Sequence, residues 1–249
     1  MESILSVQGL GVRFGSLQAV DDVTFEAQRG KITAIIGPNG AGKSSLFNLI
    51  SGAIKPSFGQ VLFEGHNVTG ASPDKMLRSG LSRSFQITNL FFELPVQENL
   101  RLAAQFLEQG RGLFRPLSAS TRAHERVEQL VEQFGLQSKR HELAGYLSHG
   151  EQRRLEIAVS LAARPRMLLL DEPTQGMSHA DTRETEALIR GLAAEHGLSI
   201  LLVEHDVDLV MNLSDHVVVM HQGQKLAEGA PAQVRGNASV QAAYFGEHH

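Results

Sequence analysis

Eight consecutive residues, from Gly37 to Ser44, have the spacing Gly-x-x-x-x-Gly-Lys-Ser that is typical of a phosphate-binding loop. A strand-like run precedes the loop and a helix-like run follows it. Glycines let the backbone curl so that N–H groups point at phosphate oxygens, and the helix N-terminus favours negative charge. Lys43 would reach the β- and γ-phosphates, and the Ser44 hydroxyl would hold Mg²⁺. The predicted nucleotide site comprises Gly37, Pro38, Asn39, Gly40, Ala41, Gly42, Lys43, Ser44 and Ser45.

Two acids follow a second strand-like run. Residues 167–170 are continuously apolar and lead into Asp171 and Glu172. Beside a phosphate-binding loop, an Asp in this position binds Mg²⁺, and the next acid lies close enough to the γ-phosphate to polarise a water molecule. Taken alone, the segment is explained equally well as an acidic turn, because Asp-Glu-Pro is good turn material. Together with the loop, it favours a Mg²⁺-dependent nucleotide hydrolase.

The composition limits the classes of protein that need to be considered. The 249 residues are 42% hydrophobic and 20% charged, as in an ordinary globular protein. The formal net charge of −4 argues against a nucleic-acid scaffold. The absence of cysteine excludes disulfides and fits a reducing cytosol. We see no secretory signal and no apolar run near the ~20 residues that span a bilayer, so we expect any membrane role to be peripheral.

The order of patterns along the chain indicates how the site is positioned. Two β segments, residues 4–13 and 23–27, come first. Residues 95–163 have a helical pattern, with apolar spacing in 97–105 and 120–134. Strand and helix patterns then alternate to the end. This alternation on both flanks of a helical block predicts a parallel α/β core with a helical insertion.

A third motif, Leu147-Ser148-His149-Gly150-Glu151-Gln152, lies near the end of the helical block, before Asp171, and it leads directly into a helix-like run. It resembles the signature motif of ABC-type ATPases, whose usual form is Leu-Ser-Gly-Gly-Gln. His149 departs from that form at a tolerant position, and Glu151 stands where Gln is commoner.

Other residues occur in the order that this resemblance implies. Phe14 resembles the aromatic residue that stacks on adenine, although a plain core aromatic is the alternative interpretation. Gln86 resembles the glutamine that contacts Mg²⁺ and the attacking water, and His205 resembles the histidine that contacts the γ-phosphate. Glu172 would act as the general base or orient water. Ser178 stands where the family usually carries Asp, which puts in doubt the usual contact between subunits.

The resemblance covers essentially the whole chain and implies its organisation. We expect a single nucleotide-binding domain over residues 1–249 with the α/β fold of P-loop NTPases. Residues 1–86 and 164–249 would form a RecA-like parallel sheet with an N-terminal antiparallel β subdomain. Residues 87–163 would form the inserted helical subdomain. The implied catalytic group is Lys43, Gln86, Glu172 and His205, and the implied Mg²⁺ ligands are Ser44, Gln86 and Asp171.

The resemblance also implies partners and location. Two ATPase subunits, identical or paralogous, would pack head to tail, and each ATP would lie between one chain's loop and the other's Ser148. Transmembrane permease subunits would bind the pair at the cytoplasmic side of the cell membrane, and an extracytoplasmic solute-binding protein would act indirectly. ATP and Mg²⁺ are the expected cofactors, hydrolysis to ADP and phosphate is the expected reaction, and we expect no nucleic-acid partner.

Within the family, several segments resemble the ATP-binding subunits of branched-chain (hydrophobic) amino-acid uptake systems, namely residues 85–91, 96–99, 112–115, 152–158, 203–211 and 243–247. Urea importers and lipopolysaccharide exporters share much of this pattern. A non-transport ABC ATPase acting on ribosomes or DNA is a more remote alternative, because the usual fused domains, coiled coils and basic arms are absent.

Aromatic and histidine residues outside these motifs admit plain interpretations. Phe85, Phe91 and Phe92 could form lobe core or line a groove that receives a helix of a membrane subunit. The scattered histidines lack metal-ligand spacing and are interpreted as surface residues. His248 and His249 are either native or a remnant of expression, and they are left out of the interpretation. The scattered histidines are His66, His124, His141, His196 and His221.

Overall fold

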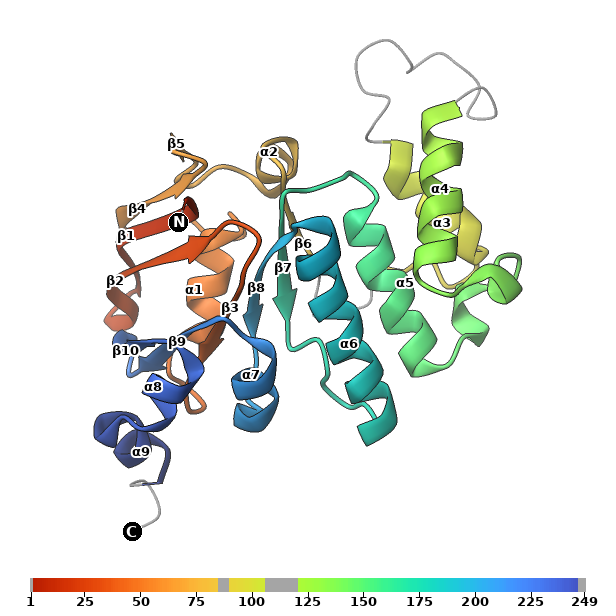
Figure 1. Cartoon of the computed structure of the whole chain (residues 1–249). Coiled ribbons are helices and arrows are strands. Elements are labelled where there is room, and N and C mark those ends of the chain that lie inside the picture. Colours follow the sequence, from red (N-terminus) through yellow and green to blue (C-terminus); the bar gives the residue numbers. More distant parts are fainter. Residues whose placement is uncertain (1, 85–89, 106–120, 246–249) are drawn as a thin grey trace.

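The computed structural model describes residues 2–84, 90–105 and 121–245, and these form two sheets with helices around them (Figure 1). One sheet has four strands in the order β2-β1-β4-β5, and the other has six in the order β10-β9-β3-β8-β7-β6. The strands are β1 (Ser3–Phe14), β2 (Leu17–Gln28), β3 (Ile32–Ile36), β4 (Phe58–Phe63), β5 (His66–Asn67), β6 (Leu81–Arg83), β7 (Met167–Asp171), β8 (Ser199–Val203), β9 (His216–His221) and β10 (Gln224–Gly229).

The four-stranded sheet is antiparallel and begins with a long hairpin. β1 and β2 pair along their length, with Val7 opposite Phe25 and Val12 opposite Val20. Gly15, at φ +61°, lies in the turn between them. Both strands are longer than the sequence predicts, because their pairing continues past Val20 to the turn, where Phe14 lies opposite Leu17.

Every residue of β3, β7 and β8 in the six-stranded sheet is buried, as expected for parallel strands that are covered on both faces. Alternate residues belong to different hydrophobic cores. Ile35 and Leu201 pack with the antiparallel sheet and the helix that follows β3, whereas Ala34 and Leu202 pack with the remaining helices. Only β10 runs antiparallel within this sheet, at its edge beside β9.

The helices differ in which core they cover. Helix α1 contributes Phe47 and Leu49 to the core shared by the two sheets. The helical block α3–α5 packs on the other side and shares one continuous core with the parallel sheet. The helices are α1 (Lys43–Ile50), α2 (Pro73–Arg78), α3 (Val96–Ala104), α4 (Thr121–Gln133), α5 (His149–Leu161), α6 (His179–His196), α7 (Val207–Leu213), α8 (Pro231–Arg235) and α9 (Ala238–Phe245), with short 3-10 helices at Gln137–Lys139 and Ala144–Tyr146.

Several of the predicted elements are found with shifted ends. The helix expected after the signature motif begins inside the motif, at His149, because Ser148 and Glu151 form a capping box at its N-terminus. The short elements β5, β6, β10, α2, α8 and α9 have no counterpart in the sequence prediction. The subdomain boundaries proposed at residues 86/87 and 163/164 stay a prediction.

Candidate functional site

The loop that follows β3 packs closely against other parts of the backbone at two of its glycines. A Cβ added to Gly37 would lie 2.2 Å from the carbonyl oxygen of Met220, and one on Gly42 would lie 2.5 Å from that of Ala19. Both glycines have positive φ, +156° and +95°. These two positions therefore require glycine both for space and, at Gly42, for the left-handed conformation that precedes α1.

Lys43, the first residue of α1, points back into the curve of the loop. Its Nζ donates hydrogen bonds to the carbonyl oxygens of Gly37 at 2.7 Å and Pro38 at 3.0 Å. The side chain is buried, and burial lowers the pKa of Lys43 while the charge of Glu172 opposes that shift. An ammonium held this way favours the arrival of an anion, because burial has removed part of its hydration.

The sheet register brings the acids of β7 to the loop. Val203 of β8 pairs with Asp171 on one side and with Ile35 on the other, so the end of β7 lies one strand away from the start of the loop. Asp171 is 2% exposed, and its Oδ2 accepts a hydrogen bond from Arg83 Nη2 at 2.9 Å. Among the described residues, Oδ1 has no hydrogen-bond partner although it is buried.

This donor set fits a divalent cation. A buried acceptor without a partner is costly, and a bound cation would satisfy it. Ser44 offers an exposed hydroxyl at the start of α1. Carboxylate and hydroxyl oxygens are hard donors of the kind that Mg²⁺ prefers. Gln86, the third predicted Mg²⁺ ligand, lies outside the described residues.

Glu172 occupies an unusual backbone conformation beside Asp171. Its φ is +44°, in the left-handed region, and its N–H donates to Val203 O at 2.9 Å. Non-glycine residues are held in this region only where the surroundings fix them, and such positions cluster at functional sites. The Glu172 side chain is half-buried, and the loop that runs toward Thr174 begins at this residue.

Beyond the end of β8, His205 is exposed and is linked to this loop through a buried carboxylate. Glu204 is fully buried, and its Oε2 accepts from the backbone N–H of His205 at 3.2 Å. Its Oε1 accepts from the N–H of Thr174 at 3.1 Å and from the Thr174 hydroxyl at 2.7 Å. Glu204 is not among the residues predicted for the site, although a carboxylate directly after an apolar strand was the available signal.

The signature residues form a self-contained helix start. Ser148 Oγ accepts from the N–H of Glu151 at 3.3 Å, and the N–H of Ser148 donates to Glu151 Oε2 at 2.8 Å. The hydrogen bond from the Ser148 backbone lowers the pKa of Glu151. Gln152 Nε2 donates to Leu147 O at 3.2 Å and fixes the preceding turn. His149 is exposed, as expected.

Ser178 has a structural role where the family usually carries Asp. It caps α6, since its Oγ accepts from the N–H of Asp181 at 3.3 Å and donates to Asp181 Oδ2 at 2.7 Å. A Cβ on Gly150 would lie 2.9 Å from Asp181 Oδ1, so this helix start packs closely on the signature motif. The capping chemistry of Asp is retained by Ser.

Within one chain, the signature motif is not brought to the phosphate loop. In Figure 1, α1 and α5 lie on opposite sides of the central strands, with β8 and β7 between them.

Phe14, at the end of β1, is 50% exposed, which makes it a surface aromatic and not a core residue. Ser45 is half-buried on α1.

The remaining histidines form no metal site in the described part of the chain, where no group of three or more His, Asp or Glu side chains could hold an ion. The exposed histidines, as predicted, are His66, His124, His141 and His196, and His221 is half-buried.

Phe91 and Phe92 are exposed, whereas Phe85 and the loop around residue 113 lie outside the described ranges. No helix in those ranges combines the length and hydropathy that a membrane span needs.

Two family models match the chain. One, described as ABC transporter, covers residues 20–175, and the other, described as Branched-chain amino acid ATP-binding cassette transporter, covers residues 224–249. The chain therefore belongs to the ATP-binding subunits of ABC transporters, a family of nucleotide-binding transport ATPases. Its mixed sheets and helices are the P-loop NTPase fold that the sequence predicts.

Particular relatives are similar over nearly their full lengths. The High-affinity branched-chain amino acid transport ATP-binding protein BraF of Pseudomonas aeruginosa is 41% identical over 98% of each chain. The corresponding protein LivG of Escherichia coli is 41% identical over 99% of each. The crystal structure of the ADP conformation of an ATP-binding cassette from an ABC transporter has a TM-score of 0.85 and 32% identity, covering 99% of this chain and 100% of that one.

Proposed function

We propose that this protein hydrolyses Mg-ATP to power the uptake of branched-chain or other hydrophobic amino acids. The relatives named for this transport, together with the match at residues 224–249, support the substrate class. The observation that carries the hydrolytic part is the buried Oδ1 of Asp171, which has no hydrogen-bond partner in the described ranges and lies one strand away from the Lys43 loop. A loop that holds a buried ammonium, beside a carboxylate with one oxygen that has no hydrogen-bond partner among the described residues, is suited to a nucleotide–metal complex.

Each residue has a role in this proposal. Lys43 and the backbone N–H groups of the loop bind the phosphates, while Ser44, Asp171 and Gln86 hold the cation. Magnesium bound with the nucleotide neutralises charge on the β- and γ-phosphates. Glu172 accepts a proton from the attacking water or orients it. His205 contacts the γ-phosphate.

The hydrogen bonds of Glu204 give these last two residues a fixed relation. Glu204 accepts hydrogen bonds from the backbone of His205 and from the loop that follows Glu172. The two residues proposed to act on the γ-phosphate are therefore positioned by one buried carboxylate. Phe14 is exposed in a position from which it can stack on a base.

The site is completed by a second ATPase chain in this proposal. Ser148 and Gly150 lie at the N-terminus of α5, which favours phosphate charge, yet α5 is remote from its own chain's loop (Figure 1). Head-to-tail packing of two chains would bring one loop to the other's signature helix. Closure on ATP and opening after hydrolysis would then be the motion that is passed to the permease.

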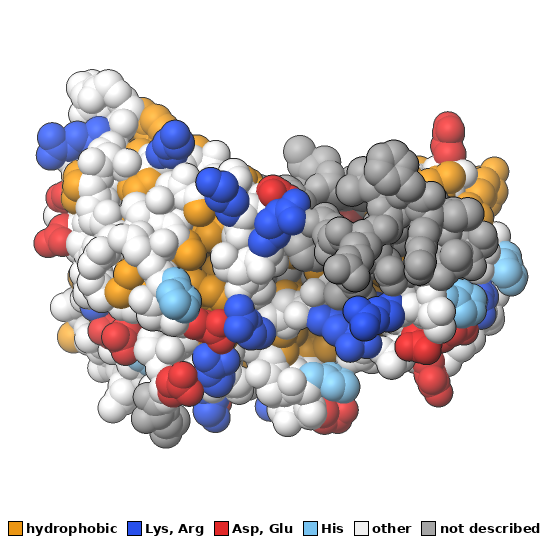
Figure 2. All heavy atoms as spheres, turned by 90° about the horizontal axis from the view of Figure 1, so that it is seen from above, with side chains coloured by type: hydrophobic (Ala, Val, Ile, Leu, Met, Phe, Trp, Pro, Cys, Tyr) orange, Lys and Arg blue, Asp and Glu red, His pale blue; other side chains and the backbone are white. Residues whose placement is uncertain are grey.

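A groove gives the permease a docking place. It has a volume of 430 Å³ and lies between α2, β6 and α5. Its apolar lining includes Met76, Leu77, Leu90 and Val159. Figure 2 looks onto the side that carries α2, where hydrophobic side chains appear among Lys and Arg side chains. We propose that a cytoplasmic helix of a transmembrane subunit binds here, which would hold the protein peripherally at the cytoplasmic face of the cell membrane.

Reconstitution tests this function. The protein would be purified with the permease and solute-binding proteins encoded beside it and placed in proteoliposomes that contain ATP. We expect uptake of leucine, isoleucine or valine that depends on Mg²⁺ and ATP. Uptake of urea instead would overturn the amino-acid assignment. Failure of the complete purified complex to hydrolyse Mg-ATP would overturn the catalytic assignment separately.

A further inference from the structure

Arg83, which no sequence motif singled out, makes direct contact with the carboxylate proposed to hold the cation. It ends the edge strand β6 and pairs in register with Leu169 of β7. Its side chain is 15% exposed, and its Nη2 lies 2.9 Å from Asp171 Oδ2. The guanidinium also lies 4.8 Å from the centre of the Phe47 ring. The guanidinium of Arg83 is therefore held in place both by its ion pair and by its contact with the ring.

The other side of the guanidinium is bound to α1. Arg83 Nη1 donates to Asn48 Oδ1 at 2.7 Å and to Ser51 Oγ at 2.8 Å. Ser44, Asn48 and Ser51 are spaced by four and three residues, so they share one face of the helix. Arg83 thus joins the face of α1 that carries the Ser44 hydroxyl to the end of β7 that carries Asp171.

The two oxygens of Asp171 are used differently as a result. Oδ2 is paired with Arg83, whereas Oδ1 has no partner among the described residues. A charge-assisted hydrogen bond from a rigid guanidinium fixes the rotation of the carboxylate. Without it, Asp171 would be a buried, uncompensated charge that is free to turn. The pairing leaves one defined oxygen for a cation.

We propose that Arg83 is a positioning residue for the metal: it orients Asp171 and sets its distance from α1, so that Oδ1 and the Ser44 hydroxyl bind the same nucleotide-bound divalent cation. This inference rests on the proposed function. Residues that hold metal ligands typically change metal affinity by about 10–100-fold when they are replaced. The role of Arg83 is therefore measurable as metal binding, apart from turnover.

The test uses the full chain with ADP and Mn²⁺ as a magnetic probe of the cation site. Arg83→Met keeps a long side chain over Phe47 but removes the guanidinium. We expect the Mn²⁺ affinity measured by electron paramagnetic resonance to fall by about 10–100-fold. ADP affinity measured in EDTA should stay within about twofold. Arg83→Lys restores the charge without the planar fork, and its Mn²⁺ affinity should be intermediate.

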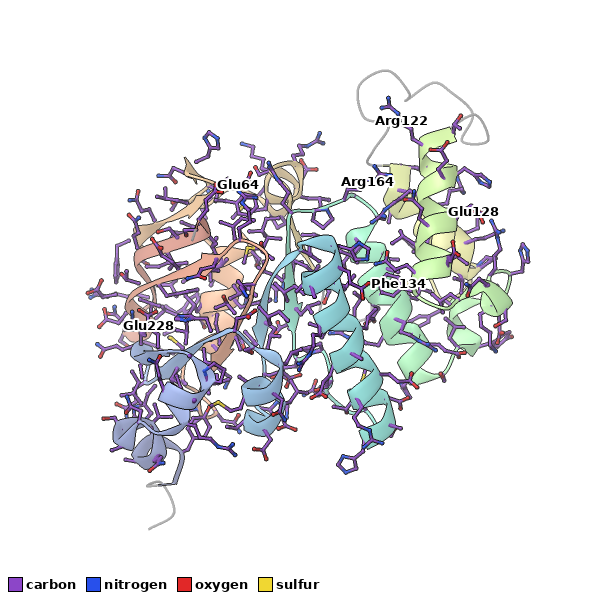
Figure 3. The ribbon with its side chains drawn as sticks, viewed as in Figure 1. Glu64, Arg122, Glu128, Phe134, Arg164 and Glu228 are labelled. Atoms are coloured by element: carbon purple, nitrogen blue, oxygen red, sulfur yellow. The ribbon has the colours of Figure 1, made fainter. Side chains whose placement is uncertain are left out.

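Arg166 provides a matched control. It is another arginine beside a phenylalanine, 5.8 Å from the Phe63 ring, and it pairs with Glu64. Glu64, labelled in Figure 3, lies by the antiparallel sheet and belongs to no part of the proposed metal site. Arg166→Met should therefore leave Mn²⁺ affinity unchanged. If it lowers that affinity as much as Arg83→Met does, the effect is general destabilisation and the inference is wrong.

Two further outcomes decide the inference. If folded Arg83→Met binds Mn²⁺ as the unchanged protein does, Arg83 does not position the ligand. If Arg83→Met does not fold, the double variant Asn48→Ala/Ser51→Ala decides, since it releases Nη1 while leaving the ion pair with Asp171. A smaller loss of Mn²⁺ affinity in this variant supports the inference, and no loss overturns it. Should the unchanged protein with ADP bind no Mn²⁺, the proposed function itself fails.

Discussion

Glu204 Oε1 accepts hydrogen bonds from both the backbone N–H and the hydroxyl of Thr174, so a fully buried carboxylate joins the end of β8 to the loop that follows Glu172. Its other oxygen accepts from the N–H of His205. Three donors therefore converge on one carboxylate. Glu204 therefore links the segments after β7 and β8 that carry Glu172 and His205, the two residues proposed to act on the γ-phosphate.

Replacing this carboxylate should lower turnover more than nucleotide binding. Glu204→Gln keeps the shape but turns one acceptor oxygen into a donor, which then faces an N–H or hydroxyl donor. Losing a hydrogen bond to a buried charged group costs about 1.5–3 kcal/mol, part of which should appear in the free energy of unfolding. We expect kcat to fall by about tenfold or more at similar ATP KM, because either the loop after Glu172 or the backbone of His205 is no longer held in position. Glu228→Gln, at the exposed β10, is the control and should change neither quantity.

Lys43→Ala should weaken Mg-ATP binding by about 10–100-fold, because a hydrogen bond from a charged donor is worth about 1.5–3 kcal/mol. The ammonium already lies against the loop, so its loss removes the cation that phosphates would meet. Titration with a fluorescent ATP analogue measures the change. Lys31→Ala, which removes an exposed lysine paired with Asp215, should bind normally. Near-normal affinity of Lys43→Ala would contradict the phosphate assignment.

Glu172→Gln should keep ATP binding and lose nearly all hydrolysis. The amide fills the same space but cannot accept a proton, and general-base catalysis contributes about 10²–10⁴-fold. Phosphate release measures turnover. The variant should also accumulate as an ATP-bound dimer, seen as a doubled mass in size-exclusion chromatography with light scattering. Retained turnover would place the base elsewhere.

Ser148→Arg should separate binding from hydrolysis. Its bulky cation would block closure of a second chain onto α5, while the loop on the far side of the sheet stays intact. We therefore expect normal ATP affinity in the monomer and loss of ATPase activity. Ser138→Arg places the same change at another exposed serine of the helical block and should remain active. Loss of nucleotide binding by monomeric Ser148→Arg would rule out the head-to-tail arrangement.

Local patterns were enough for the parts of the site that are local in sequence. The Gly37–Ser44 spacing requires only one strand, one turn and one helix, and all three are present. The strand and helix patterns of residues 199–203 and 207–213 predict β8 and α7 with the bounds that the structure shows, because four apolar residues follow Ser199 in β8 and Asp206 caps α7. Short edge strands such as β6 carry too few residues to show a period, which is why they were not predicted.

Contacts between distant segments could not be read in this way. Arg83 and Asp171 are 88 residues apart, and Glu204 and Thr174 are 30 apart. Their pairing depends on the order β8-β7-β6, which no local pattern specifies. The exposure of Phe14 is also decided by where the hairpin ends and not by its residue type. The sequence therefore predicts residues that would contact the nucleotide, and the structure adds residues such as Arg83 and Glu204 that hold the predicted ones in place.

The capping box at Ser148 has a consequence for how substitutions in this motif are weighed. Glu and Gln both complete such a box, since either side chain can accept the hydrogen bond from the N-terminal residue. Glu151 is therefore a conservative replacement for the commoner Gln, made within one hydrogen-bond pattern. A search that counts mismatches would penalise Glu151 and His149 alike. Glu151 preserves the hydrogen bonds at the start of the helix, whereas His149 changes only an exposed side chain.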